Sequence, residues 1–134
     1  MILVDTNVLL DLVTDDPDWL EWSLARLEEA ALAGPVLIND VVYAEISIRY
    51  ERIEHLDTML ADAMIEIAPT PRPALFLAGK ALQHYRAAGG VRTGVLPDFF
   101  IGAHAAVEGW PLLTRDARRY RTYFPKLTLI APPV

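Results

Sequence analysis

Two acidic side chains of this sequence follow short apolar runs. Asp5 comes directly after Ile2–Val4, and Asp116 lies shortly after Leu112–Leu113. Continuous apolar runs of this kind are typical of strands that are buried on both faces of a parallel sheet. The carboxyl ends of parallel strands meet at one edge of the sheet, where α/β proteins bind their ligands. We therefore expect these two carboxylates to lie close together at that edge.

Two further acids, Glu45 and Asp98, are placed to reach the same edge. Glu45 lies in the helix expected after the apolar run 36–38, and Asp98 precedes the apolar stretch 99–103. An acid in apolar surroundings is costly unless it is paired or binds a cation. Four neighbouring carboxylates would also repel one another, and carboxylate oxygens are the ligands that Mg²⁺ and Mn²⁺ prefer. The four acids together predict a site for a divalent metal ion.

Each of these acids also has a simpler explanation. Asp5, Asp98 and Asp116 all stand where a helix is expected to begin, and Asp is a common helix N-cap. Glu45, taken alone, fits a solvated helix residue. His104 lies within the apolar helix after Asp98, and we expect it to be packed and hydrogen-bonded rather than a metal ligand. The convergence of four acids on one edge favours the metal site.

Short apolar runs alternate with helical segments along the chain, which predicts an α/β fold with a central, mainly parallel sheet. The expected strands cover residues 2–4, 36–38, 65–67, 112–113 and 127–130. Helices are expected from Asp5, from Asp16 as a cap to about 33, from Asn39 or Asp40 to about 51, and over about 54–64, 73–88 and 98–108, with a short one from Asp116. Residues 91–97 are expected to form an irregular loop. No linker or repeat interrupts the pattern, so one domain over residues 1–134 is expected.

The composition is that of a globular chain: 134 residues, 53% hydrophobic and 22% charged, with no cysteine. Disulfides and thiolate metal sites are therefore excluded. No apolar run approaches the roughly 20 residues that span a membrane, and no basic leader precedes the first strand, so a cytoplasmic protein without membrane contact is expected.

The formal net charge of −6 argues against binding nucleic acid through overall charge. Local basic residues would instead have to contact the phosphates. The candidates lie beside two of the acids: Arg92, Arg115, Arg118 and Arg119. Those beside Asp116 fit a solvated helix face equally well.

Four segments of the sequence resemble the acidic motifs of PIN domains: Asp5-Thr6-Asn7, Tyr43-Ala44-Glu45-Ile46, Pro97-Asp98-Phe99-Phe100-Ile101-Gly102-Ala103-His104-Ala105 and Thr114-Arg115-Asp116. Their order and spacing are most similar to those of VapC toxins, and the resemblance covers nearly the whole chain. It implies a PIN-like three-layer sandwich and a Mg²⁺- or Mn²⁺-dependent endoribonuclease. It also implies a homodimer that a small VapB-like antitoxin holds inactive.

The resemblance also assigns roles by position in the motifs. Asp5 and Asp98 would bind the metal directly, and Asp116 would bind it directly or through water. Glu45 would complete the acidic pocket and help to orient the attacking water. Two polar residues would support the pocket, Asn7 and Thr114.

Two other features leave alternatives open. The segment from Trp19 to Leu27 carries more apolar side chains than one core contact needs, so it fits either the core or a groove for an antitoxin helix. For function, the alternative is a non-catalytic RNA-binding or regulatory PIN-like module whose acids are only caps. A metal-dependent phosphatase is disfavoured because Asn7 stands where its second aspartate would be needed.

Overall fold

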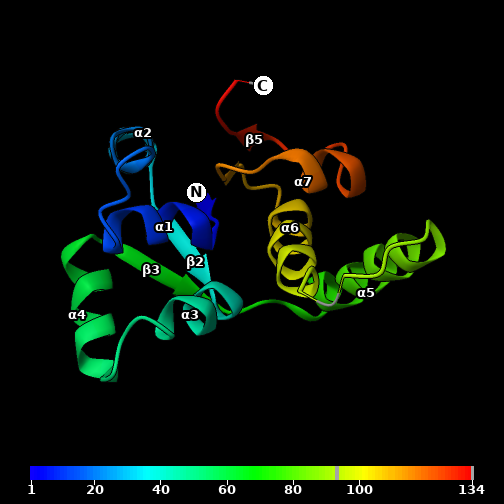
Figure 1. The fold of residues 1–134 in the computed structure, drawn as a ribbon, viewed down its shortest axis with the longest axis horizontal. Coiled ribbons are helices and arrows are strands. Elements are labelled where there is room, and N and C mark those ends of the chain that lie inside the picture. Colours follow the sequence, from blue (N-terminus) through cyan, green and yellow to red (C-terminus); the bar gives the residue numbers. More distant parts are fainter. Residues whose placement is uncertain (93, 134) are drawn as a thin grey trace.

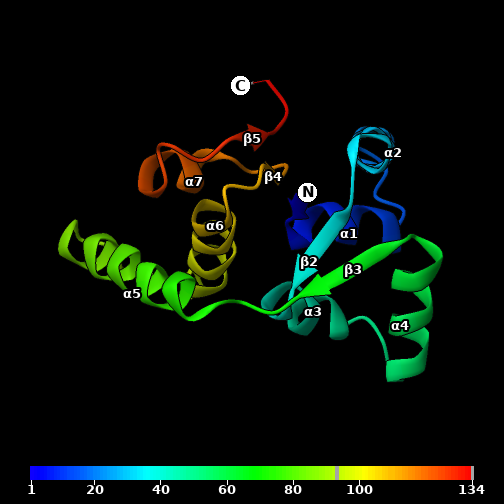
Figure 2. The ribbon, with the colours of Figure 1, turned by 180° about the vertical axis from the view of Figure 1, so that it is seen from behind.

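The computed structural model describes residues 1–92 and 94–133, and its centre is a sheet of five parallel strands. The strands lie in the order β3-β2-β1-β4-β5 (Figures 1 and 2). Their bounds are β1 Ile2–Val4, β2 Val36–Asn39, β3 Ile65–Ala68, β4 Leu112–Leu113 and β5 Leu129–Ile130. The last strand is shorter than the expected 127–130.

Helices connect every pair of successive strands and flank the sheet, which confirms the expected three-layer α/β sandwich. Their bounds are α1 Thr6–Val13, α2 Leu20–Ala33, α3 Asp40–Ser47, α4 Ile53–Asp62, α5 Arg72–Ala87, α6 Leu96–Glu108 and α7 Arg118–Tyr123. The helix α5 packs on α6 and extends away from the sheet (Figures 1 and 2). No helix in the described residues is long and apolar enough to cross a membrane.

The central strands are apolar because they are covered on both faces. Leu3 and Val4 of β1, Ile38 of β2 and both residues of β4 are fully buried. Leu3 is aligned with Leu37 on one side and with Leu112 on the other, so the apolar runs stack across the sheet. This burial explains why the strands could be recognised as continuous apolar segments.

Three helix boundaries differ from the prediction. Helix α2 begins at Leu20 and not after Asp16, although the Asp16 side chain accepts hydrogen bonds from the backbone N–H groups of Asp18 and Trp19 (2.9 and 3.0 Å), as an N-cap does. Helix α3 ends at Ser47 instead of about 51, and α6 begins at Leu96, within the expected loop 91–97. Thr93, also in that loop, lies outside the described residues.

The strand order places β1 and β4 side by side, where the connections change direction. Chain segments run from β1 outward to β2 and β3, then return past β1 to β4 and β5. At such a switch point the loops after the two central strands diverge and leave a crevice for a ligand. The residues that follow β1 and β4 are Asp5 and Thr114.

Candidate active site

Asp5 is a buried carboxylate, 4% exposed, at the carboxyl end of β1. Its Oδ1 accepts a hydrogen bond from the backbone N–H of Thr6 (2.7 Å), so it is the N-cap of α1, as expected. Its Oδ2 accepts hydrogen bonds from the hydroxyls of Thr114 and Tyr120, both at 2.8 Å. Capping and a second function are therefore compatible, because the two oxygens face different partners.

The surroundings of Asp5 disfavour its negative charge. Burial is the largest cause and repulsion from Asp98 the next, and together they raise the pKa of Asp5 from 3.8 to about 6. The hydrogen bonds from Tyr120, Thr114 and Thr6 act in the opposite direction. A buried carboxylate with a raised pKa, beside another acid and at the switch point of a sheet, is typical of a functional site.

Asp98 lies in the first turn of α6 and does not cap it, since the N-cap position is taken by Val95. The prediction of Asp98 as a cap is therefore wrong. Its Oδ2 instead forms an ion pair with the Arg119 guanidinium of α7. Burial raises the pKa of Asp98, Arg119 lowers it, and the charges of Glu45 and Asp116 raise it again.

Asp116 follows β4 and is exposed. Its backbone N–H donates to Thr114 Oγ1 at 3.1 Å. It does not cap α7, whose N-cap is Ala117 without a side-chain hydrogen bond, so this prediction of a cap is also wrong. The Asp116 carboxylate is close enough to raise the pKa of Asp98.

Glu45 is the fourth acid of the cluster, which we call the acidic site: Asp5, Glu45, Asp98 and Asp116. Glu45 Oε1 accepts a 2.7 Å hydrogen bond from Thr6 Oγ1, which links α3 to α1. The Asn7 amide donates to Asp5 Oδ2 (3.4 Å) and to Thr114 Oγ1 (3.3 Å). The two residues predicted as polar supports, Asn7 and Thr114, thus lie between the first and last acids.

The chemistry of the donors fits a hard divalent cation, because every side chain offers carboxylate oxygen. Among the described residues, no three His, Asp or Glu side chains are grouped closely enough to hold a metal ion. Arg119 supplies the positive charge beside Asp98 instead. Burial is the largest cause of the raised pKa of both Asp5 and Asp98, and repulsion from neighbouring acids adds to it. A bound cation would relieve this repulsion.

Tyr120 was missed by the sequence analysis. It is 1% exposed on α7, its hydroxyl donates to Asp5, and burial raises its pKa well above 10. The only available signal was a tyrosine in a basic segment, which does not point to a buried site. His104, by contrast, lies where expected: it is 1% exposed, with Nδ1 3.3 Å from Asn39 Nδ2.

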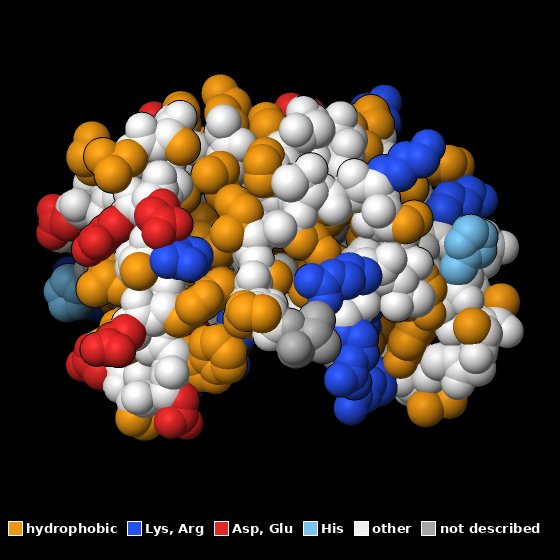
Figure 3. All heavy atoms as spheres, turned by 90° about the horizontal axis from the view of Figure 1, so that it is seen from above, with side chains coloured by type: hydrophobic (Ala, Val, Ile, Leu, Met, Phe, Trp, Pro, Cys, Tyr) orange, Lys and Arg blue, Asp and Glu red, His pale blue; other side chains and the backbone are white. Residues whose placement is uncertain are grey.

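A polar hollow of about 410 Å³ opens beside the acidic site, lined by Arg92, Asp116, Arg118, Arg119, Thr122 and Tyr123. Three of the four arginines predicted to contact phosphate are therefore brought together. Arg115 is not among them, since its guanidinium is paired with Asp11. In Figure 3 most visible Lys and Arg side chains gather on one half of the molecule, and most Asp and Glu on the other.

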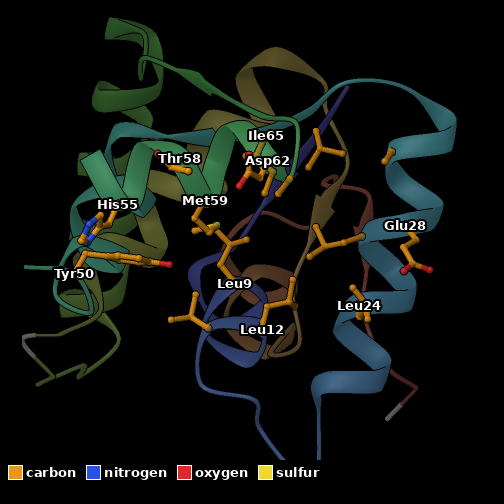
Figure 4. A pocket seen from close by; sticks show the side chains of 15 residues that line it. Leu9, Leu12, Leu24, Glu28, Tyr50, His55, Thr58, Met59, Asp62 and Ile65 are labelled. Atoms are coloured by element: carbon orange, nitrogen blue, oxygen red, sulfur yellow. The ribbon is translucent and has the colours of Figure 1, made fainter. Parts of the chain in front are cut away.

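A second hollow of about 720 Å³ is largely apolar and lies between α1, α2 and α4. We call it the α1/α2/α4 groove. Figure 4 shows Leu9 and Leu12 of α1, Leu24 of α2 and Met59 of α4 turned toward it. Leu24 is 42% exposed, so part of α2 is not core.

Comparisons with known proteins agree on one family. The model of the PIN domain matches residues 2–125. The fold is similar to that in a crystal structure of VapBC2 from Rickettsia felis bound to a promoter DNA fragment (TM-score 0.75, 23% identity, 99% of this chain and 100% of that chain). It is also similar to FitAcB from Neisseria gonorrhoeae (0.68, 20%, 97% and 96%) and to DNA-bound VapBC from Salmonella typhimurium (0.71, 15%, 97% and 96%). No curated protein sequence matches significantly.

Proposed function

This chain belongs to the PIN domain family, and we propose that it is a metal-dependent endoribonuclease, the toxin of a VapBC-like toxin–antitoxin pair. PIN domains are generally nucleases. The observation that carries the proposal is the buried Asp5, whose pKa is raised to about 6 by burial and by Asp98 at the switch point of the sheet. Structural caps do not need to be gathered in this way.

Mg²⁺ or Mn²⁺ would be held by Asp5, Asp98 and Asp116. When bound, the ion would make a water molecule more acidic and neutralise charge that builds up on the scissile phosphate. Glu45 would complete the acidic site and help to orient the attacking water. Thr114 and Tyr120 would fix the Asp5 carboxylate through their hydrogen bonds to its Oδ2.

The RNA would lie in the polar hollow, where Arg92 and Arg118 would contact phosphates. Arg119 lies between the hollow and Asp98, and it would turn to the RNA backbone once another cation neutralises Asp98. Such contacts position a backbone without reading its sequence. They would let an acidic protein of net charge −6 bind a polyanion locally.

The α1/α2/α4 groove supports the proposal that the protein binds an antitoxin. An amphipathic helix would place its apolar face against Leu12, Leu24 and Met59, and basic residues would match Glu28 and Asp62 at the lining. The structures that share this fold are VapBC and FitAB complexes, according to their descriptions. An arginine of the partner inserted among the acids would pair well with carboxylates. A homodimer and a cytoplasmic location are further parts of this proposal.

Purified protein with a panel of cellular RNAs tests the nuclease. Cleavage should require added Mg²⁺ or Mn²⁺ and stop with a chelator, and Asp98→Asn should abolish it. Asp18→Asn is the matched control, because Asp18 is an exposed aspartate outside the acidic site. Cleavage that survives complete chelation would refute the metal mechanism. RNA binding without cleavage would favour the non-catalytic module.

The proposed partner is tested by expressing the native operon and purifying this protein from the cells. We expect a small neighbouring gene product to copurify, and the free protein to scatter light as a dimer. A strictly monomeric protein without a partner would leave a nuclease that is not a toxin of this kind.

A further inference from the structure

Asp11 is a second buried carboxylate, 1% exposed, outside the acidic site. It lies on α1 and accepts a 2.6 Å hydrogen bond at Oδ2 from Ser23 Oγ of α2. Both oxygens also contact the Arg115 guanidinium, from Nε to Oδ2 at 3.0 Å and from NH2 to Oδ1 at 2.9 Å. This two-pronged pairing fixes the guanidinium plane as well as its position.

Two further contacts hold Arg115 in place, one of its guanidinium and one of its backbone. Its guanidinium lies over the Trp19 ring, 5.4 Å from the centroid. Its backbone N–H donates to Asn7 Oδ1 at 3.1 Å. The side chain is 30% exposed, but its Nε and Nη2 edge is committed to Asp11, and Arg115 does not line the polar hollow that holds the other three arginines. A two-pronged phosphate contact through that edge would have to break a pair whose loss leaves the Asp11 charge buried and unpaired, which is strongly unfavourable.

The pair is attached to the acidic site through two neighbours in the chain. Thr114 donates to Asp5 Oδ2, and Asp116 donates its backbone N–H to Thr114 Oγ1. Arg115 stands between these two residues, so anchoring its side chain to α1 fixes the loop from which they project.

We propose that Arg115 and Asp11 form a positioning pair that holds Thr114 and Asp116 in place for the acidic site, and that Arg115 is not an RNA contact. The inference rests on the proposed function, because the geometry being held is that of the metal site. A supporting residue of this kind acts on metal affinity before any RNA is present. A phosphate contact would act on RNA affinity and its salt dependence.

The test uses Arg115→Lys, Asp11→Asn and the double variant. Lysine keeps the charge beside Asp11 and loses the two-pronged geometry, so folding should survive. The matched control is Arg26→Lys, since Arg26 also pairs with a carboxylate, that of Glu29, and also lies over a Trp ring, that of Trp22. Melting curves establish that each variant is folded at the assay temperature.

Mn²⁺ affinity is measured by calorimetry without RNA, and kcat and KM with RNA. Each single variant should bind Mn²⁺ about tenfold more weakly, the size seen for residues that support metal ligands. The double variant should bind Mn²⁺ no more weakly than the single variant with the lower Mn²⁺ affinity, because paired residues act as a unit. The loss should appear in kcat, with KM for RNA and its salt dependence unchanged, and Arg26→Lys should match wild type.

Unchanged Mn²⁺ affinity in folded variants would overturn the inference. If Arg115→Lys also raised KM and flattened the salt dependence, Arg115 would be a phosphate contact. If only the melting temperature fell, the pair would be purely structural. Failure of the proposed function is recognised separately, because wild type itself would then bind no Mn²⁺ and cut no RNA, and the inference would fall with it.

Discussion

Replacing Asp5 with Asn should make the metal-free protein more stable at neutral pH. The pKa of Asp5 is about 6 in the folded protein and 3.8 as an ordinary carboxyl, so the folded state binds the proton more tightly than the unfolded chain. The stability from this proton is complete below pH 3.8 and is lost as the pH rises through 6. At about 1.36 kcal/mol per pKa unit, ionised Asp5 costs up to about 3 kcal/mol at pH 7.5.

Asn is neutral at every pH and is about as good an N-cap as Asp. An Asn side chain at position 5 avoids the cost of a buried charge, and its oxygen can still accept the capping hydrogen bond from the Thr6 backbone N–H. Asp5→Asn should therefore melt about 5–10 °C higher than wild type at pH 7.5. The difference should shrink to nearly zero at about pH 4, where Asp5 of the folded wild type is itself protonated.

Mn²⁺ should reverse the order of the two proteins. A ligand that binds only the folded state stabilises it, by about 2.7 kcal/mol at a concentration 100 times Kd. Wild type should gain this stabilisation from Mn²⁺, and Asp5→Asn should gain very little. The assay is a set of thermal melts from pH 4 to 8, with and without Mn²⁺, and Asp18→Asn should follow wild type throughout. An Asp5→Asn protein that melts lower than wild type at pH 7.5, or keeps the full Mn²⁺ shift, would refute the reasoning.

Three further changes separate the parts of the molecule. Tyr120→Phe removes a hydrogen bond that lowers the pKa of Asp5, so Mn²⁺ affinity measured by calorimetry should fall about tenfold. Gly102→Ala would place a Cβ 2.6 Å from the Phe124 ring and 2.9 Å from the Tyr120 ring, so urea unfolding should show a loss of about 1–3 kcal/mol. Leu24→Glu puts a charge in the α1/α2/α4 groove and should weaken partner binding at least about tenfold in titrations, whereas Leu32→Glu, outside that groove on α2, should not. An unchanged Mn²⁺ affinity in Tyr120→Phe, an unchanged unfolding free energy in Gly102→Ala or an unchanged partner affinity in Leu24→Glu would contradict the respective argument.

The strands and the placing of the acids could be predicted because they depend on local pattern and topology. Leu3 and Leu112 lie in strands that are covered on both faces, so the sequence of each strand is apolar without interruption. The carboxyl ends of such strands converge, which brings the residues after β1 and β4 together whatever lies between them. Helix α6 also ends at Glu108, as expected, and Gly109 follows it in the left-handed region at φ 71°.

Partnerships between distant residues could not be predicted, because no local pattern encodes them. Asp11 and Arg115 are 104 positions apart, and each alone fits a solvated helix residue. The cap at Asp98 was misplaced because Leu96 and Pro97 enter the helix as its first residues, and the buried Val95 takes the N-cap position. Tyr120 was missed because its buried position depends on α7 packing against α6.

The acidic site has a net charge that must always be offset, and the structure shows two ways in which this is done. Asp5 holds a proton more tightly than an ordinary carboxyl, and Asp98 is paired with Arg119. A divalent ion would replace both, since it neutralises more charge than either. An arginine from a partner would offer the same guanidinium chemistry that Arg119 already supplies. Inhibition by such a partner would therefore require no new kind of site, only a cation that outcompetes the metal for the same carboxylates.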